Sequence, residues 1–317
     1  MQVVCLGILV ADFFTQPVTA LPQPGELKTT DGFHLSAGGC AANVAVNLRR
    51  LGREVTVVGK VGQDRLGQFV VSELEEQHVE TRWISRSATR ATSITVILNV
   101  RGEDRRYLHS VGANGDFSSA DISSEALRDA RILYVGGYMA MPGFPAADLA
   151  RVLQNAKNAG LTTVLDVVIP KDCSDAALQV SPVLPYTDYF LPNTDEAKVL
   201  TGTSDPVQQA RQLSKSNPQA TIVITLGSEG SLAMRDGRLI RTAPIPMQSI
   251  DESGAGDAFA AGLITGLLED WPLEFTLKFA GVIGASCTRA VGCSPGVFHF
   301  QEALDFLNRK SCLTSNS

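Results

Sequence analysis

The chain has 317 residues and a formal net charge of −6, and 44% of its residues are hydrophobic and 19% charged. This composition is typical of a globular protein with a substantial core, either one large α/β domain or two smaller ones. The sequence has no long basic run, which argues against a nucleic-acid partner, because such a surface needs clustered Lys and Arg. No stretch stays apolar for the roughly 18 residues that a membrane span requires. The six cysteines lack the CxxC spacing of a zinc site.

The N-terminal sequence MQVVCLGILVADFF predicts a first core strand. Its apolar run is short and no basic segment precedes it, so it does not have the pattern of a secretory signal peptide. We therefore expect a cytoplasmic protein.

Apolar, β-branched runs recur along the chain, and amphipathic stretches separate many of them. After the N-terminal run, further runs lie at residues 54–59, 131–136, 162–168, 187–191 and 221–226, and helical patterns include 40–52, 66–77 and 144–160. This alternation predicts a mostly parallel sheet covered by helices on both faces. The nearly continuous apolar character of the strands fits burial on both sides.

Two segments break this rhythm. Residues 13–36 contain three prolines, and residues 92–111 predict two strands joined by a polar turn at Arg101–Asp104. Neither segment has a helical pattern. We therefore expect them to form a small antiparallel sheet outside the main layer.

The sequence DESGAGD, residues 251–257, precedes an apolar helical run. Gly254, Ala255 and Gly256 are small enough for the backbone to approach a ligand, and the first N–H groups of a helix have no intrahelical acceptor. An anion placed there gains hydrogen bonds and the helix dipole, which is worth ~0.3–2 kcal/mol. Asp257, in the first turn, either caps the helix or takes a proton from a hydroxyl held over the turn. Taken alone, this heptad fits a capped turn and an anion site equally well.

The sequence SAGGCAANV contains a glycine pair, Gly38 and Gly39, before a predicted helix. Asn43 falls on the first turn of that helix, where its amide either reaches a polar ligand crossing the glycines or belongs to an ordinary loop-to-helix junction. The first strand is not followed by GxGxxG, which argues against an NAD-dependent oxidoreductase.

The sequence LPNTDEAKVL follows a predicted strand. Asn193 and Glu196 would then face the edge where the strands of open α/β sheets end, the usual ligand-binding edge. A carboxylate and an amide there suit hydrated Mg²⁺ with phosphate oxygens. The alternative is a capping box at a helix N-terminus. Asp166 also ends an apolar run, but Asp is common at strand ends, so we do not assign it to the site.

The sequence TLGSEGS, residues 225–231, runs from a strand end into a glycine-rich turn. It either lies against a nucleotide or forms a β-hairpin, and the motif by itself leaves both open.

Together and in this order, these motifs resemble the PfkB (ribokinase-like) carbohydrate kinase family. The resemblance covers almost the whole chain. Its elements are Asp12 after the first strand, the GG-x-x-x-N segment, VGKVGQDRLG (58–67), GAN (112–114), PNTDE (192–196), TLGSEG (225–230) and GAGD (254–257).

The resemblance implies a Rossmann-like three-layer α/β/α sandwich with a small β-sheet lid. The α/β core would comprise residues 1–12, 37–91 and 112–317, and the lid residues 13–36 and 92–111. The implied reaction is transfer of the γ-phosphoryl group of ATP to a sugar hydroxyl.

The resemblance also implies a role for each motif residue. Asp257 would be the catalytic base, and Gly254, Ala255 and Gly256 would form the anion hole. The sugar would be bound by Asp12, Gly38, Gly39 and Asn43. The nucleotide and its phosphates would be bound by Asn193, Thr225, Gly227 and Gly230, and Glu196 would serve Mg²⁺.

One departure from the family pattern concerns a monovalent cation. The family usually has Thr after the first Asp of the signature, whereas this chain has Glu252. Many members bind K⁺ near that Asp and near a loop that would correspond to residues 289–296 here. A charged Glu252 puts K⁺ activation in doubt. The alternatives are that its side chain points to solvent or that its carboxylate interacts with the cation itself.

Several alternatives remain open at this point. A nucleoside kinase of the same superfamily would need a base pocket, for which Phe13, Phe14 and Phe33 are candidates. A non-catalytic sugar-binding regulator is disfavoured by the intact GAGD turn. The sequence does not decide among ribose, fructose, 2-keto-3-deoxygluconate and similar acceptors. A homodimer through the lid sheet is a further expectation, because exposed sheets tend to find a partner.

Overall fold

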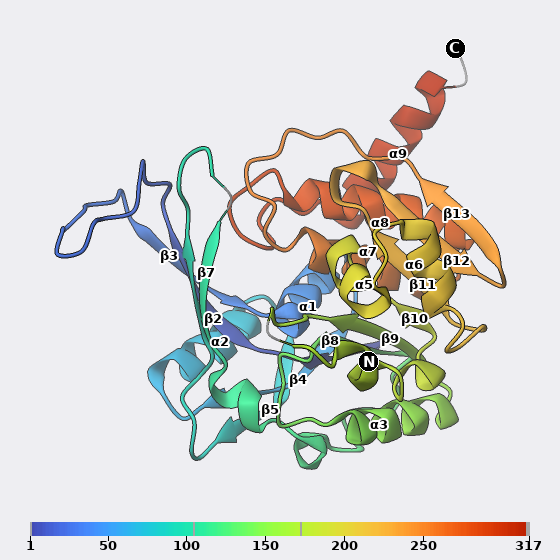
Figure 1. The fold of residues 1–317 in the computed structure, drawn as a ribbon, viewed down its shortest axis with the longest axis horizontal. Helices are drawn as coiled ribbons and strands as arrows, with labels where there is room; N and C mark the ends of the chain where they lie inside the picture. Colours follow the sequence, from blue (N-terminus) through green and yellow to red (C-terminus); the bar gives the residue numbers. More distant parts are fainter. Residues whose placement is uncertain (1, 104, 172, 315–317) are drawn as a thin grey trace.

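The computed structural model describes residues 2–103, 105–171 and 173–314. Its main sheet has nine strands in the order β13-β12-β11-β10-β9-β8-β1-β4-β5 (Figure 1). The strands are β1 (Val3–Gly7), β4 (Val55–Gly62), β5 (Glu80–Ser87), β8 (Ile132–Tyr138), β9 (Thr162–Val167), β10 (Tyr189–Phe190), β11 (Thr221–Thr225), β12 (Ser231–Arg235) and β13 (Arg238–Thr242). Pairing is parallel from β5 to β11 and antiparallel from β11 to β13.

Helices cover both faces of this sheet, so the expected three-layer α/β/α fold is confirmed. They are α1 (Cys40–Arg50), α2 (Arg65–Glu76), α3 (Ala146–Asn158), α4 (Ala176–Val180), α5 (Thr194–Thr201), α6 (Pro206–Leu213), α7 (Ala255–Leu268), α8 (Leu273–Cys287) and α9 (Phe300–Thr314). Successive side chains of a strand point to opposite faces. Val3 and Cys5 accordingly join the core cluster that includes α1, α7 and α8, whereas Val4 and Leu6 join the cluster that includes α3 and α6.

A second, four-stranded sheet stands beside the main layer, at the left of Figure 1. Its order is β3-β2-β6-β7, with β2 (Val10–Thr15), β3 (Phe33–Gly38), β6 (Ile94–Leu98) and β7 (Arg106–Ser110). The predicted pair of strands in residues 92–111 is present as β6 and β7.

The pairing in this second sheet differs from the expectation in one respect. The β2–β3 and β6–β7 pairs are antiparallel, but β2 and β6 run parallel. Parallel neighbours need a long crossover, and the chain supplies one, because α1, β4, α2 and β5 lie between β3 and β6.

The boundary between the two sheets lies inside the first apolar run. β1 ends at Gly7 and β2 begins at Val10, so Asp12 and Gly38, which the expected division placed in the core, lie on strands of the second sheet. Periodicity could not locate this boundary, because one apolar run serves two sheets. Whether the second sheet acts as a lid stays a prediction.

Candidate active site

The motif residues gather at the edge where the parallel strands end. The chain crosses to one side of β1 to form β4 and to the other side to form β8, so the sheet has a switch point at β1. Ligands of open α/β sheets bind outside the carboxyl ends of the strands at such a point. Asp166 lies near the end of β9, and an isolated bridge pairs Asn193, after β10, with Thr225, at the end of β11.

The GAGD turn leads directly into α7. Gly254 precedes the helix with a φ of 72°, in the left-handed region, and a Cβ there would lie 2.5 Å from the Cβ of Cys293. Glycine is therefore required at this position by conformation and by packing. A Cβ on Gly256, by contrast, would meet no heavy atom within 4 Å. The first turn of α7 thus faces open space, as an anion-binding helix N-terminus must.

The glycine pair positions the start of α1 beside this turn. Gly39 has a φ of 90°, and a Cβ on it would lie 2.4 Å from the carbonyl oxygen of Ile8. α1 begins one residue later, and Asn43 lies in its first turn. The Asn43 Nδ2 group donates a hydrogen bond of 2.7 Å to Oδ2 of Asp257. The motif that contains the glycine pair and the GAGD motif therefore meet through a direct contact.

The carboxyl group of Asp257 has a pKa closer to neutrality than that of an ordinary aspartate. Burial raises its pKa to about 6, and hydrogen bonds from Asn43 and Cys40 act in the opposite direction. A base whose pKa lies close to the operating pH combines the correct protonation state with a strong driving force for proton transfer.

Asp12 faces the same space from β2. The Asp12 side chain is buried, and a Cβ on Gly38 would lie 1.9 Å from its Oδ2 atom, so the carboxylate needs glycine at that position. Its pKa is raised to about 6 by burial and by Asp257, against a hydrogen bond from Thr95. The Thr95 hydroxyl also lies 3.0 Å from Nδ1 of His109. Thr95, which the motifs did not reveal, is the neighbour of Asp12 in the register of β2 and β6.

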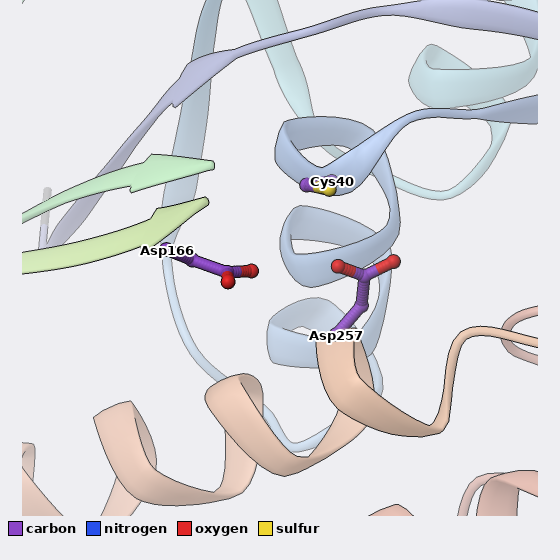
Figure 2. A group of neighbouring side chains, drawn as sticks. All are labelled: Cys40, Asp166 and Asp257. Carbon is purple, nitrogen blue, oxygen red and sulfur yellow. The ribbon is translucent and has the colours of Figure 1, made fainter. Parts of the chain in front are cut away.

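Asp166 belongs to the site, although it was left out of the sequence-based assignment. Figure 2 shows its side chain extending from β9 toward Asp257, with Cys40 of α1 close by. One ligating atom of each of these three residues lies within 4.8 Å of the others. The Tyr134 hydroxyl donates to Asp166 at 2.9 Å. The only available signal was the edge position that Asp166 shares with Asn193.

The electrostatics of this cluster follow from buried like charges. Burial, followed by Glu196 and Asp257, raises the pKa of Asp166 well above its usual range. Burial and the neighbouring carboxylates Asp257 and Asp166 also raise the pKa of the Cys40 thiol. Cys40 is therefore a poor nucleophile, because the reactive form of a cysteine is the thiolate.

The Asn193–Glu196 pair forms the capping box that was the alternative explanation of this motif. Oδ1 of Asn193 accepts from the backbone N–H groups of Asp195 and Glu196, and Oε2 of Glu196 accepts from the N–H of Asn193 at 2.8 Å. Burial nevertheless raises the pKa of Glu196 to about 7, opposed by the Asn193 backbone and assisted by Asp195 and Asp257. The motif thus begins α5 and also presents a carboxyl group toward the cluster.

The TLGSEG segment forms the hairpin between β11 and β12. Gly227 and Gly230 have φ values of 56° and 95°, and a Cβ on Gly230 would lie 2.2 Å from the carbonyl oxygen of Thr242. The hairpin by itself explains both glycines. A Cβ on Gly227 would meet no heavy atom within 4 Å, which leaves this side of the turn open to a ligand.

Asp251 opens the signature and is held by three segments of the chain. Its Oδ1 atom accepts from Nη1 of Arg105 at 2.6 Å and from the N–H of Ser253 at 2.9 Å. Its Oδ2 atom accepts from the N–H of Gly292 at 2.9 Å, so the loop 289–296 does approach this carboxylate. Glu252, the unusual residue of the signature, is exposed.

Comparisons with known proteins agree with this arrangement. A profile of the pfkB family carbohydrate kinases matches residues 1–297. The chain belongs to the pfkB family of carbohydrate kinases. It is therefore an enzyme that phosphorylates a sugar, and the expected family is confirmed.

Individual relatives match over nearly their full length. Ribokinase of Haemophilus influenzae is 26% identical over 306 residues, covering 95% of this chain and 97% of the relative. The 5-dehydro-2-deoxygluconokinase of Clostridium perfringens is 27% identical over 323 residues, covering 98% and 93%. Among solved structures, Arabidopsis thaliana ribokinase complexed with ribose and ATP has a TM-score of 0.80 at 25% identity, covering 96% of this chain and 98% of the other.

The nucleoside kinase alternative is not favoured by these relatives, which are sugar kinases. The three candidate aromatic residues also do not form a common pocket. Phe13 and Phe14 are consecutive on β2 and point to opposite faces of the second sheet. Phe33 is 69% exposed.

Proposed function

We propose that this pfkB family kinase transfers the γ-phosphoryl group of ATP to a sugar hydroxyl with Asp257 as the general base. The observation that carries this proposal is the hydrogen bond between Asn43 and Asp257, which joins the sugar-binding motif to the anion-binding turn. The ribose and ATP named in the Arabidopsis ribokinase structure support the same pair of substrates here.

The positions of these groups support the following proposed roles. Asp12 and Asn43, with the backbone at Gly38 and Gly39, hold the acceptor sugar, and one of its hydroxyl groups gives its proton to Asp257. The N–H groups of the turn that begins at Gly254 stabilise the negative charge on the transferring group. Phosphoryl transfer depends mainly on such positioning and charge stabilisation.

The nucleotide side of the site lies at the ends of β10 and β11. Asn193 and Thr225 are bridged there, and Gly227 and Gly230 shape the following turn. We assign ATP to this edge because the edge lies beside the N-terminus of α5. Glu196, in the first turn of that helix, is close enough to Asp257 for the Asp257 carboxylate to raise its pKa.

Mg²⁺ fits the carboxyl groups on this side of the site. Asp166 and Glu196 offer oxygen ligands, and each has a pKa raised by burial and by neighbouring carboxylates. A divalent cation prefers oxygen ligands and would relieve this repulsion. When bound, it would neutralise charge on the ATP phosphates, and Asp166 and Glu196 would hold it.

A requirement for K⁺ is not part of the proposal. The Asp251 carboxylate, beside which the family resemblance placed the cation, accepts from Arg105, Ser253 and Gly292. We infer that turnover does not depend on K⁺, and the same assay in sodium and in potassium salts tests this.

Two further proposals concern the state of the enzyme. We propose a homodimer through the second sheet, because its edge strand β7 is exposed along its whole length. We also propose a cytoplasmic location. Among the described residues, five cysteines are free thiols, as is usual in a reducing compartment, and each helix is too short or too polar to span a membrane.

A coupled assay of ADP release over a panel of sugars and nucleosides tests the function. We expect stimulation by a pentose, a ketohexose or a keto-sugar acid in the presence of Mg²⁺ and ATP. Stimulation by nucleosides alone would overturn the proposed acceptor class, and transfer from ADP but not ATP would overturn the donor.

A further inference from the structure

The hairpin of the second sheet reaches across to the catalytic turn through one side chain. Arg105 lies between β6 and β7, in the turn of that hairpin. Its Nη1 group donates to Oδ1 of Asp251 at 2.6 Å and also to the hydroxyl of Ser253. The two partners come from the segment that leads into Gly254, so this contact joins the second sheet to the start of the GAGD turn.

Asp251 links Arg105 to the segment that leads into the GAGD turn. It is buried, and its two oxygens also accept from the N–H groups of Ser253 and Gly292. Of the three donors to Asp251 among the described residues, only the Arg105 guanidinium carries a formal positive charge; the other two are backbone N–H groups. Removing the partner of a buried charge is costly, because the remaining charge is left uncompensated. The conformation of the segment before Gly254 therefore depends on the position of the hairpin.

We propose that Arg105 is a positioning residue, whose ion pair with Asp251 holds the Gly254–Gly256 turn in its anion-binding conformation while the second sheet lies against it. The inference rests on the proposed function of that turn. The Arg105 guanidinium supplies the positive charge beside Asp251. Because Arg105 belongs to the second sheet's hairpin, the geometry of the anion hole depends on the position of that sheet.

The neighbouring Arg106 provides a matched control. It belongs to the same hairpin and pairs with Glu103 of that hairpin, and both side chains are 48% exposed. An exposed ion pair of this kind contributes little to stability. Replacing Arg106 removes the same charge from the same hairpin without touching Asp251.

A cavity beside the contact makes chemical rescue feasible. Its volume is about 440 Å³, and its lining includes Arg105, Asp251 and Glu252. Truncation of Arg105 to alanine would enlarge this space next to an uncompensated carboxylate. A small planar cation such as guanidinium could then enter and restore the charge.

The test compares Arg105→Ala, Arg105→Lys and Arg106→Ala with the wild-type enzyme in the steady-state sugar kinase assay. We expect Arg105→Ala to lower kcat by about 10- to 100-fold, the size of effect that a displaced catalytic group produces. Arg106→Ala should retain the wild-type kcat. Millimolar guanidinium chloride should raise the activity of Arg105→Ala and not that of Arg106→Ala, and Arg105→Lys should retain part of kcat.

A second measurement does not depend on activity. Hydrogen exchange of the peptide that spans residues 249–258 should be faster in Arg105→Ala than in Arg106→Ala, at equal melting temperature. Equal exchange and equal kcat in the two variants would overturn the proposal. A loss of activity in Arg105→Ala that guanidinium does not restore, together with unchanged exchange, would also overturn it. If the wild-type enzyme phosphorylated no sugar, the proposed function would fail instead, and the exchange comparison would still decide the role of Arg105.

Discussion

The Asn43 side chain donates to the Asp257 carboxylate at 2.7 Å, although 214 residues separate the two along the chain. Each residue lies in the first turn of its own helix, α1 or α7. The contact therefore brings two helix N-termini together over one site. Both positive dipole ends favour negative charge in the space between them, which suits a phosphoryl group passing from a nucleotide to a sugar.

Asp257→Asn should lower kcat by about 10²–10⁴, the usual contribution of a general base. Asparagine has nearly the shape of aspartate, but it cannot take the proton of the acceptor hydroxyl. Sugar binding, measured by calorimetry, should survive within a few-fold. A variant with wild-type turnover would contradict the assignment of Asp257 as the base.

The stability of the same variant provides a control for misfolding. Burial raises the pKa of Asp257 to about 6 in the folded protein, above the value of about 3.9 of an unperturbed aspartate. The ionised carboxyl group therefore costs stability above pH 6, and this cost disappears as the pH falls to about 4. Asp257→Asn should melt at or above the wild-type temperature at pH 8, and the difference should vanish near pH 4.

The pH dependence of turnover should show an acid limb near pH 6. Asp257 must be ionised to accept a proton, and its pKa lies at about 6. Asn43→Ala removes a hydrogen bond that favours the ionised form, so it should move the acid limb of kcat to higher pH. The profile of kcat at saturating sugar checks this. An unmoved limb would show that another group controls it.

Alanine substitutions at Gly254 and Gly256 should have different effects, the first on the melting temperature and the second on kcat. In Gly254→Ala the new methyl group meets Cys293 at 2.5 Å and the backbone has a positive φ, so the melting temperature should fall. In Gly256→Ala the methyl group enters open space, so the fold should be unaffected while kcat falls, because the methyl group occupies the space that the transferring phosphoryl group needs. Thermal melts and kcat of the two variants test this. A Gly256→Ala enzyme with wild-type kcat would argue against an anion hole at this turn.

Glu196→Gln should raise the Mg²⁺ concentration needed for half-maximal activity. Glutamine still accepts from the N–H of Asn193, so the cap of α5 remains, but the negative charge that would attract the metal is lost. Asp195→Asn is the matched control, because it removes an adjacent exposed carboxylate. The Mg²⁺ titrations are carried out at fixed ATP. Equal titration curves for both variants would exclude Glu196 from the metal site.

Leu108→Lys should convert a dimer into a monomer if two copies associate through the second sheet. Leu108 lies on the edge strand β7 and is 65% exposed. A lysine on an edge strand opposes pairing with another sheet. Leu178→Lys, at a 75% exposed leucine on α4, is the control. Light scattering after gel filtration measures the mass, and a monomeric wild-type protein would contradict the proposed dimer.

Much of the fold was predictable from local patterns. The runs at 131–136 and 162–168 correspond closely to β8 and β9, and the amphipathic stretch 40–52 contains α1. β5 and the β12–β13 hairpin were missed. β5 contains charged and polar residues among its apolar ones, because it is an edge strand with a half-exposed face, and its pattern is weak.

The candidate site was predictable only as separate motifs. The capping box at Asn193 and the hairpin at Gly227 show that the local explanations of these motifs hold alongside any functional one. Asp166 was considered but not assigned, and Thr95 was not found, because nothing in their immediate sequence distinguishes a strand residue that faces the site from one that does not.

The layers, the family and the order of the motifs could be predicted from local patterns alone, because periodicity and short glycine-rich patterns are local properties of the chain. Which side chains meet depends on the folded arrangement. Arg105 reaches Asp251 across 146 residues, and Asp166, on β9, faces Asp257, in the first turn of α7 (Figure 2). Such contacts depend on the crossovers and packing that bring distant segments together, and these cannot be read from a local pattern.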